Sequence, residues 1–551
     1  MRIHRLGVAV VAALAVAGLV TSAAIGDEGH GRGDLQRIKH IVVIYEENHS
    51  FDNLYGGWEG VNGRSQADAA HTVQVGQSGA PYTCLLQNDV NLAAVLPANC
   101  TDSTTGSTFT SHFTNNPFSI EAFIPKEART CPQPGVFASN GLPPSAANLP
   151  GGCTRDIVHR FYQEQYQLNH GLQNRYTTGS DAVGLTQGYY DTTALPIYAY
   201  LHHAGHPHYA IADDFFQAAF GGSFLNHQWL IAAATPSWPN AVHPLVDSNG
   251  MPANYPLYHA TGPVTVPEPA GTRACPAPGT PDPNPGLACG PYAVNTIQPL
   301  TQPTSSNPTK LPAQTGTTIG DELSAAGVSW AWYSGGWSNA AGEFMSPGYT
   351  NGAAACTDPD SFPNPAWPYC PNKVFQFHHQ PFNYFAAYAP GTAGRTHLRD
   401  EVEFQQLVTA SDQQCALDSV SFVKPIGLEN ENPGYTSETR GSGHLVDLLQ
   451  SIENSKCGKD TMIIVTYDEF GGQWDHVSPP GQGGTAGPHD QWGPGTRIPT
   501  LIVASDLKSD FSVDHTQYDT TSILATIEAR WGLAPLTSRD AAVNDLSSVF
   551  H

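Results

Sequence analysis

Four apolar runs rich in valine and isoleucine predict β-strands along this chain. They are IKHIVVIY (38–45), VSWAWYS (328–334), TMIIVTYDE (461–469) and RIPTLIVAS (497–505). The first and the last two are apolar without a break, which is typical of strands in a parallel sheet that helices cover on both faces. Helical patterns stand beside these runs, at residues 318–327, 444–455 and 519–532. The alternation predicts an α/β fold with a doubly wound, mainly parallel sheet.

Long segments rich in Pro, Gly, Ser and Thr separate these elements. They lie near residues 60–150, 235–317 and 345–375. Segments of this length in a compact protein usually form lids or walls of a site, and disorder is the alternative. The chain has 551 residues, of which 40% are hydrophobic, so it can bury a large core. We therefore expect residues 35–551 to form a single domain that carries three loop insertions.

The first residues have the three parts of a secretory signal peptide. A basic start is followed by the apolar run 7–20 and by the small residues Ala23 and Ala24. The apolar run is short for a bilayer core of about 30 Å, so removal of residues 1–24 is favoured over a membrane anchor. The sequence thus predicts a secreted or periplasmic protein with no integral membrane segment in its mature form.

Ten cysteines in an exported chain indicate disulfide bonds, because no CxxC pair or zinc-binding spacing is present. Pairing of sequence neighbours is the simplest expectation, although the sequence leaves other pairings open. The expected pairs are Cys84–Cys100, Cys131–Cys153, Cys275–Cys289, Cys356–Cys370 and Cys415–Cys457.

The charge balance argues against nucleic acid as a partner. Asp and Glu number 48 against 24 Lys and Arg, and the net charge is −24 at pH 7. A chain with this charge repels polyanions and anionic membranes. The 23 histidines would offset part of the negative charge in mildly acidic surroundings.

Acidic side chains follow two of the predicted strands where each strand ends. Glu47 and Asn48 come after the first strand, and Asp468 and Glu469 end the third. The ligand crevice of an open parallel sheet lies beyond the carboxyl ends of its strands, so the four side chains are expected to converge. Close carboxylates repel one another, and an all-oxygen set suits a hard divalent metal ion, whose identity stays open. The alternative is that these residues cap helices and solvate loops.

Several histidines and one threonine add candidate chemistry. His159, His378, His379 and His444 lie at the expected edges of elements, where imidazoles could bind an anionic substrate or protonate a leaving oxygen. The chain lacks GxSxG, GxxxxGK[ST] and HExxH motifs. Thr186 stands between two glycines in GLTQGYYD and is a candidate nucleophile that a metal ion could activate, although such a threonine is usually a turn residue.

Five ordered blocks of the sequence resemble the bacterial phosphoesterase family of acid phosphatases and phosphatidylcholine-type phospholipases C. The blocks are IKHIVVIYEENHSFDNLYG (38–56), DIVHRFYQEQ (156–165), GLTQGYYD (184–191), FHHQPFNYF (377–385) and TMIIVTYDEFGGQWDHVSPP (461–480). The resemblance implies an alkaline-phosphatase-like α/β core and a single phosphoesterase catalytic domain. It further implies that one divalent ion is held by Glu47, Asn48, Asp468, Glu469 and Thr186, and that catalysis involves Thr186, His159, His378, His379 and His444.

Within this family, residues 212–236 resemble the acid-phosphatase branch. The resemblance therefore implies hydrolysis of small phosphomonoesters through a phosphothreonine intermediate, with phospholipase C activity on phosphatidylcholine-type lipids as the alternative. A secreted binding protein without catalysis is a more remote alternative. Gln187 departs from the methionine that is common before the Gly-Tyr pair, which leaves the surroundings of Thr186 open.

Overall fold

A computed structural model gives the structure of residues 33–86, 96–104, 106, 108–122, 156–349 and 375–550. The expected signal peptide and the expected pairs Cys131–Cys153 and Cys356–Cys370 lie outside these residues. The other three expected disulfides, Cys84–Cys100, Cys275–Cys289 and Cys415–Cys457, are confirmed.

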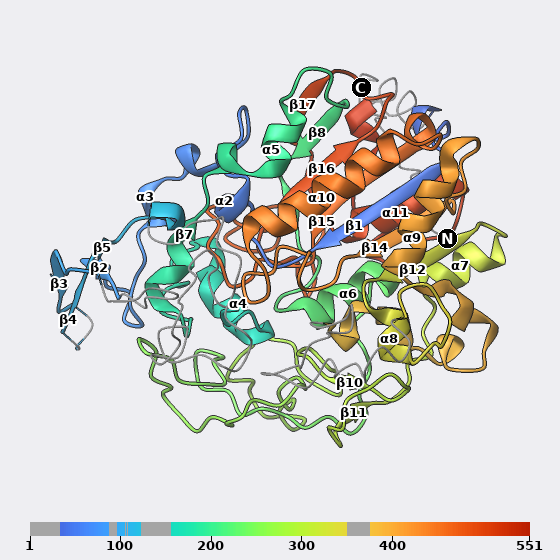
Figure 1. Cartoon of the computed structure of the whole chain (residues 1–551). Coiled ribbons are helices and arrows are strands. Elements are labelled where there is room, and N and C mark those ends of the chain that lie inside the picture. Colours follow the sequence, from blue (N-terminus) through green and yellow to red (C-terminus); the bar gives the residue numbers. More distant parts are fainter. Residues whose placement is uncertain are drawn as a thin grey trace, which may run out of the picture.

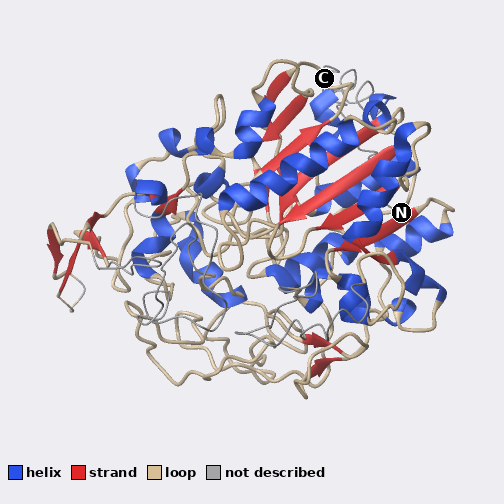
Figure 2. Ribbon diagram, in the orientation of Figure 1, coloured by secondary structure: helices blue, strands red, loops and turns tan. Residues whose placement is uncertain are grey.

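An eight-stranded sheet forms the centre of the molecule, as the arrows of Figure 2 show. Its neighbouring strands pair in parallel except at the two contacts of β16. The predicted α/β fold with a mainly parallel sheet is confirmed. In spatial order the strands are β13 (Leu398–Asp400), β12 (Trp330–Ser334), β14 (Val420–Lys424), β1 (His40–Glu46), β15 (Thr461–Tyr467), β16 (Thr500–Val503), β8 (Tyr209–Ala212) and β17 (Phe511–Asp514).

Strands β1 and β15 form the middle of the sheet. They pair in parallel from His40 opposite Thr461 to Glu46 opposite Tyr467. All residues of β15 and all but the first of β1 are buried, as expected for strands covered on both faces. Because the two strands end at the same level, the loops after them start from one edge of the sheet.

One strand direction differs from the prediction. The apolar run at 497–505 contains β16, which is antiparallel to both β15 and β8. An unbroken apolar run indicates that a strand is buried on both faces, but it does not indicate whether the strand runs parallel or antiparallel to its neighbours. The chain between β15 and β16 stays at the carboxyl edge, and a return from the same edge gives an antiparallel pair, whereas a parallel pair needs a crossover.

Helices cover the sheet in two groups, which Figure 1 shows in front of and behind the strands. Helix α10 contacts α5 and α9, while α6 contacts α7 and α11. The three expected helical segments are present as α7, α10 and α11. The longer helices are α4 (Phe161–Leu168), α5 (Pro196–Leu201), α6 (Ser223–Ala232), α7 (Ile319–Ala325), α9 (Glu401–Thr409), α10 (Glu438–Glu453) and α11 (Thr521–Trp531), and the shorter are α2 (Phe51–Leu54), α3 (Ala69–Thr72) and α8 (Trp337–Ala341).

The expected insertions contain mostly loops in the described part of the chain (Figure 2). Residues 235–317 hold one small parallel pair, β10 and β11, whereas small pairs also join β2 to β5, β3 to β4, β6 to β7 and β9 to β18. The bounds are β2 (Cys84–Leu85), β3 (Cys100–Asp102), β4 (Phe109–Ser111), β5 (Phe113–Thr114), β6 (Phe118–Ser119), β7 (Gly188–Tyr189), β9 (Phe215–Phe216), β10 (Gln298–Pro299), β11 (Lys310–Leu311) and β18 (Tyr518–Asp519).

A fully buried arginine ties together loops at the carboxyl edge. The Arg497 guanidinium lies 3.2 Å from Asp475 and 3.4 Å from Asp52. It also donates hydrogen bonds to the main-chain oxygens of Asn62, at 2.7 Å, and Asp213, at 2.6 Å. A buried cation with this many partners fixes the loops that follow β1, β8 and β15 relative to one another.

Replacing Arg497 with methionine should destabilise the protein strongly. The change would leave Asp52 and Asp475 buried without their cation, which typically costs about 3–5 kcal/mol. The measurement is the free energy of unfolding from urea denaturation. Arg399 is the control, because it is 39% exposed and lies 3.9 Å from Glu403. Arg399→Met should change stability by less than about 0.5 kcal/mol, and equal effects of the two variants would contradict the role of Arg497.

Candidate active site

The four side chains expected at the strand ends lie at one edge of the sheet. Glu47 and Asn48 follow β1, and Asp468 and Glu469 follow the adjacent strand β15. All four are at most 2% exposed. Three buried carboxyl groups and one carboxamide therefore leave the sheet from neighbouring strands.

The Asn48 backbone and Gly471 are packed against each other. Asn48 has a left-handed φ of 71°, which asparagine tolerates better than most residues. A Cβ atom at Gly471, whose φ is 62°, would lie 2.1 Å from the carbonyl oxygen of Asn48. A side chain at 471 is therefore excluded, and the close backbone contact holds the β1 and β15 loops together.

Ser223 joins these two loops through its hydroxyl group. Its Oγ lies 3.2 Å from Oε1 of Glu469 and 3.4 Å from Oδ1 of Asn48. The residue is 5% exposed and is the first residue of α6, after the N-cap Gly222. A helix N-terminus presents main-chain N–H groups and a partial positive charge, so it favours an anion such as a phosphate group.

His227 lies one helical turn after Ser223 and faces the same centre. Its Nδ1 lies 2.8 Å from the carbonyl oxygen of Ser223 and 3.6 Å from Asp468. With Nδ1–H donating to that carbonyl, Nε2 carries a buried lone pair that has no hydrogen-bond partner among the described residues. Its ring stacks on His379 with centroids 5.3 Å apart. Burial, with Lys424 and His379 adding to it, lowers the pKa of His227 well below its ordinary value.

Glu47 collects three polar partners. His379 Nε2 contacts its Oε1, Lys424 Nζ lies 3.0 Å from the same oxygen, and Asn432 Nδ2 donates to Oε2 at 2.6 Å. The two contacts to Oε1 are close but lack hydrogen-bond geometry. Burial opposes ionisation, yet His379 and Lys424 hold the pKa of Glu47 well below its ordinary value. Glu47 is therefore the ionised member of the cluster.

The two other carboxyl groups are in a different electrostatic state. Burial raises the pKa of Asp468 well above its ordinary value, with Glu47 adding to the effect against Lys424. Burial followed by Asp468 raises the pKa of Glu469. Both carboxyl groups thus lack enough positive charge nearby to stay ionised together.

These residues fit a cation. Ligand atoms of Glu47, His227 and His379 all lie within 4.8 Å of one another, and the three side chains are buried. Four buried atoms in the cluster have no hydrogen-bond partner within the described part of the chain, namely Glu47 Oε1, His227 Nε2, His379 Nε2 and Asp468 Oδ2. Carboxylate oxygens with imidazole nitrogens suit divalent metals such as zinc, manganese or iron, whereas oxygens alone suit magnesium or calcium.

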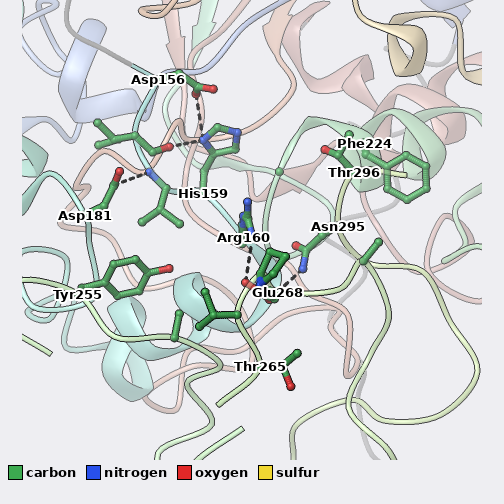
Figure 3. Close-up of a pocket in the computed structure, with 17 residues that line it drawn as sticks. Asp156, His159, Arg160, Asp181, Phe224, Tyr255, Thr265, Glu268, Asn295 and Thr296 are labelled. Carbon is green, nitrogen blue, oxygen red and sulfur yellow. Dashed lines mark hydrogen bonds and ion pairs between the residues drawn. The ribbon is translucent and has the colours of Figure 1, made fainter. Parts of the chain in front are cut away.

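His159 connects this cluster to a cavity of about 520 Å³. Its Nε2 lies 3.3 Å from Glu469, while Nδ1 lies 2.6 Å from the Ile157 carbonyl oxygen and 3.4 Å from Asp156. Figure 3 shows His159 at the cavity with Asp156 beside it. Gly222, the residue before Ser223, also lines this cavity, so a molecule in the cavity would reach the start of α6.

The structure gives the remaining expected residues different surroundings. His378 lies beside the cluster, with its ring centroid 4.8 Å from that of His379. His444 on α10 instead lies 2.7 Å from Glu401 in a separate group with Glu429, where these carboxylates raise its pKa to about 9 against the effect of burial. The Thr186 hydroxyl donates to the Val183 carbonyl oxygen at 2.9 Å and lies 3.4 Å from Thr177 Oγ1.

Four residues of the cluster were missed by the sequence analysis: Ser223, His227, Lys424 and Asn432. The signal for Ser223 was present, because a serine after Gly-Gly and before an apolar helical pattern is a typical helix start. His227 follows it at the spacing of one helical turn. Lys424 is the last residue of the short strand β14. The sequence of this strand has neither a clear apolar–polar alternation nor a long apolar run, so the strand was not predicted.

Comparisons with known proteins agree on one family. The model of the Phosphoesterase family matches residues 38–534 of this chain. Phospholipase C A of Mycobacterium tuberculosis is 24% identical over 553 residues, which cover 94% of this chain and 78% of that protein. Phospholipase C B of the same organism is 35% identical over 159 residues, and the match spans only 30% of its length. Non-specific phospholipase C6 of Arabidopsis thaliana is 27% identical over 138 residues, or 26% of its length.

A solved structure also resembles part of the chain. The lipoteichoic acid synthase LtaP from Listeria monocytogenes covers 62% of this chain and 67% of its own, with 9% identity and a TM-score of 0.28. In the described residues, no helix is both long and apolar enough to cross a membrane.

Replacing Asp468 with asparagine should reduce metal retention, as measured by elemental analysis of the purified protein. It should also change the response of the melting temperature to added metal. Without metal, the variant should melt no lower than the wild type, because one of three crowded carboxyl groups is gone. Added zinc or manganese should raise its melting temperature less, because binding to the folded state stabilises by mass action.

Asp510→Asn is the matched control, since that side chain is 81% exposed. It should bind metal and respond to it as the wild type does. Equal metal content and an equal metal-induced shift in Asp468→Asn would remove Asp468 from the ligand set.

Proposed function

The chain belongs to the Phosphoesterase family of hydrolases, and on that basis we propose that it is a secreted, metal-dependent phospholipase C with Ser223 as its nucleophile. The contact of the Ser223 hydroxyl with both Asn48 and Glu469 carries this proposal. It puts a hydroxyl at a helix N-terminus, against a cluster that fits a cation and beside a cavity. These are the parts that attack on a phosphate ester requires.

Ser223 is a better candidate than Thr186 for this role. Among the contacts of the described residues, the Thr186 hydroxyl pairs with Val183 and Thr177, whereas that of Ser223 contacts the metal-ligand candidates. Ser223 is 5% exposed, and Gly222 before it lines the cavity, while Thr186 is fully buried. We therefore assign the expected threonine role to Ser223, so that the covalent intermediate would be a phosphate ester of Ser223, which keeps the headgroup when the substrate is a phospholipid and is a phosphoserine when it is a monoester.

Glu47, Asn48, Asp468 and Glu469 would hold one divalent ion, and His227 offers a further nitrogen through Nε2, which is unpartnered among the described residues. When bound, the ion would neutralise these carboxylates, lower the pKa of the Ser223 hydroxyl and polarise the phosphoryl group. The residues present would thus supply both the ligands and the reacting group.

The reaction proceeds in two displacements. The Ser223 oxygen, after its proton has passed to solvent, attacks phosphorus; the bond from phosphorus to the leaving alcohol breaks, and that alcohol takes a proton from His159. Water then attacks the phosphorus atom bound to Ser223 and gives one proton to His159. The bond from phosphorus to the Ser223 oxygen breaks, the phosphate product leaves, and the Ser223 oxygen regains a proton from solvent. The α6 N-terminus, with His378 beside the cluster, would stabilise charge on the phosphoryl oxygens, while His379 and Asn432 hold Glu47 in place.

We prefer phospholipase C to acid phosphatase as the proposed activity. The relative named phospholipase C A matches over 94% of this chain, and others that match over shorter stretches are also named phospholipases C. The acid-phosphatase interpretation rests on residues 212–236 and stays the second candidate. The cavity next to His159 offers room for a second substituent on phosphorus, which a diester has and a monoester lacks.

The proposed location is outside the cytoplasm. The N-terminal sequence has the features of a signal peptide, and three disulfides are present in the described residues. Disulfides persist in oxidising compartments, which supports export of the chain.

Ser223→Ala should lower kcat by about a thousandfold or more, since a nucleophile that acts with its partners is not replaced by neighbours. Thr186→Val keeps the shape of the side chain and should retain kcat within a few-fold. Turnover of a chromogenic phosphate ester measures both variants, and circular dichroism checks their folding. Loss of activity in Thr186→Val with activity kept in Ser223→Ala would return the nucleophile role to Thr186.

A comparison of substrates should separate the two candidate activities. We expect kcat/KM for phosphatidylcholine to exceed that for p-nitrophenyl phosphate, measured with the same metal-loaded protein at pH 5 and pH 7. A clear preference for the monoester at both pH values would establish the acid-phosphatase alternative instead.

A further inference from the structure

We propose that an exposed apolar rim beside the cavity docks this enzyme onto the surface of a zwitterionic phospholipid bilayer. The rim consists of Val242, Leu245 and Val266, all from the long segment 235–317. The proposal rests on the proposed phospholipase C activity, and it adds where the enzyme meets its lipid.

The three side chains are unusually exposed for aliphatic residues. Val242 and Leu245 are each 54% exposed, and Val266 is 75% exposed. They lie on neighbouring stretches of chain, because the Leu245 N–H donates to Thr265 Oγ1 at 3.0 Å. Exposed apolar side chains that gather beside a cavity are a common feature of interaction sites.

The rim is continuous with the cavity of the candidate active site. Thr265, Val266 and Pro267 line that cavity on one side, and His159 and Gly222 line it on another. Figure 3 shows Thr265 and His159 at the same cavity. A lipid held at the rim would therefore have its phosphate group near the start of α6.

The part of this segment that carries the rim, residues 236–267, is almost without charge. Residues 236–267 contain no Lys or Arg and a single acidic residue, Asp247, although the whole chain has a net charge of −24. Asp247 is 4% exposed and accepts hydrogen bonds from Tyr258 and from the main-chain N–H groups of Asn249 and Met251. No carboxylate or ammonium group of this segment would thus have to leave water at a lipid surface.

The charge also selects the kind of lipid. A protein with a net charge of −24 is repelled by anionic bilayers, and the rim offers no basic residue to compensate. A neutral, zwitterionic surface avoids this repulsion, so phosphatidylcholine is the fitting surface as well as the proposed substrate.

An ionic contact between the buried Glu268 and the half-exposed Arg160 fixes the rim relative to the catalytic residues. Glu268, two residues after Val266, lies 3.2 Å from Arg160 and accepts hydrogen bonds from Gln163 at 2.9 Å and Asn295 at 3.1 Å. Arg160 directly follows His159 in the chain. Figure 3 shows Glu268 between Arg160 and Asn295. The rim therefore stands at a set position from His159.

The test is the double variant Val242→Asp with Leu245→Asp, neither of which lines the cavity. Two carboxylates on the rim should lower the rate on long-chain phosphatidylcholine vesicles about tenfold or more, since apolar burial at the interface drives this kind of binding. Turnover of a short-chain phosphatidylcholine below its micelle concentration should stay within twofold. Phe344→Asp is the control, because Phe344 is 65% exposed and lies outside this segment.

The proposal is overturned if the rim variant and the Phe344→Asp control lose vesicle hydrolysis equally, or if the rim variant loses neither activity. A binding measurement separates this failure from failure of the proposed activity. An environment-sensitive dye attached at Leu245→Cys should shift to the blue and brighten with phosphatidylcholine vesicles, and a dye at Phe344→Cys should not. A dye shift without phosphatidylcholine hydrolysis supports docking at the rim and contradicts the phospholipase C activity. Hydrolysis without a dye shift supports the phospholipase C activity and contradicts docking at the rim.

Discussion

Repulsion among buried carboxyl groups is the constraint on which this site depends. The parallel pairing of β1 and β15 brings Glu47, Asp468 and Glu469 to one edge of the sheet, where water cannot screen them. The protein supplies only part of the compensating charge, through Lys424 on Glu47. A bound cation would complete it, so affinity for a metal ion would arise from the same crowding that makes the arrangement costly without a cation.

The sequence predicted the features that depend on local pattern. Long apolar runs reveal buried strands, and neighbouring parallel strands deliver their next residues to the same edge of the sheet, so Glu47 and Asp468 could be expected to meet. Three of the disulfides followed from sequence proximity. These predictions succeeded because each needs only the order of residues along the chain and one general rule about the sheet.

Other features depend on contacts between distant segments and could not be predicted in this way. The direction of β16 is decided by the path of the loop before it, and the short strand that carries Lys424 has no distinctive pattern. Thr186 and Ser223 are both small hydroxyl residues next to glycine, so their sequence surroundings did not separate them. Their contacts do: the Ser223 hydroxyl meets Asn48 and Glu469, which lie 175 and 246 residues away along the chain.

Helix α6 ties the stability of the site to the stability of the whole fold. It carries both Ser223 and His227, and all ten of its residues are buried. The Ser223 hydroxyl is thus part of the core rather than of a surface loop, and regions of high contact density open only with the whole fold. Heat should therefore inactivate the enzyme at the temperature where the domain unfolds, with no earlier stage in which a folded protein has lost its site.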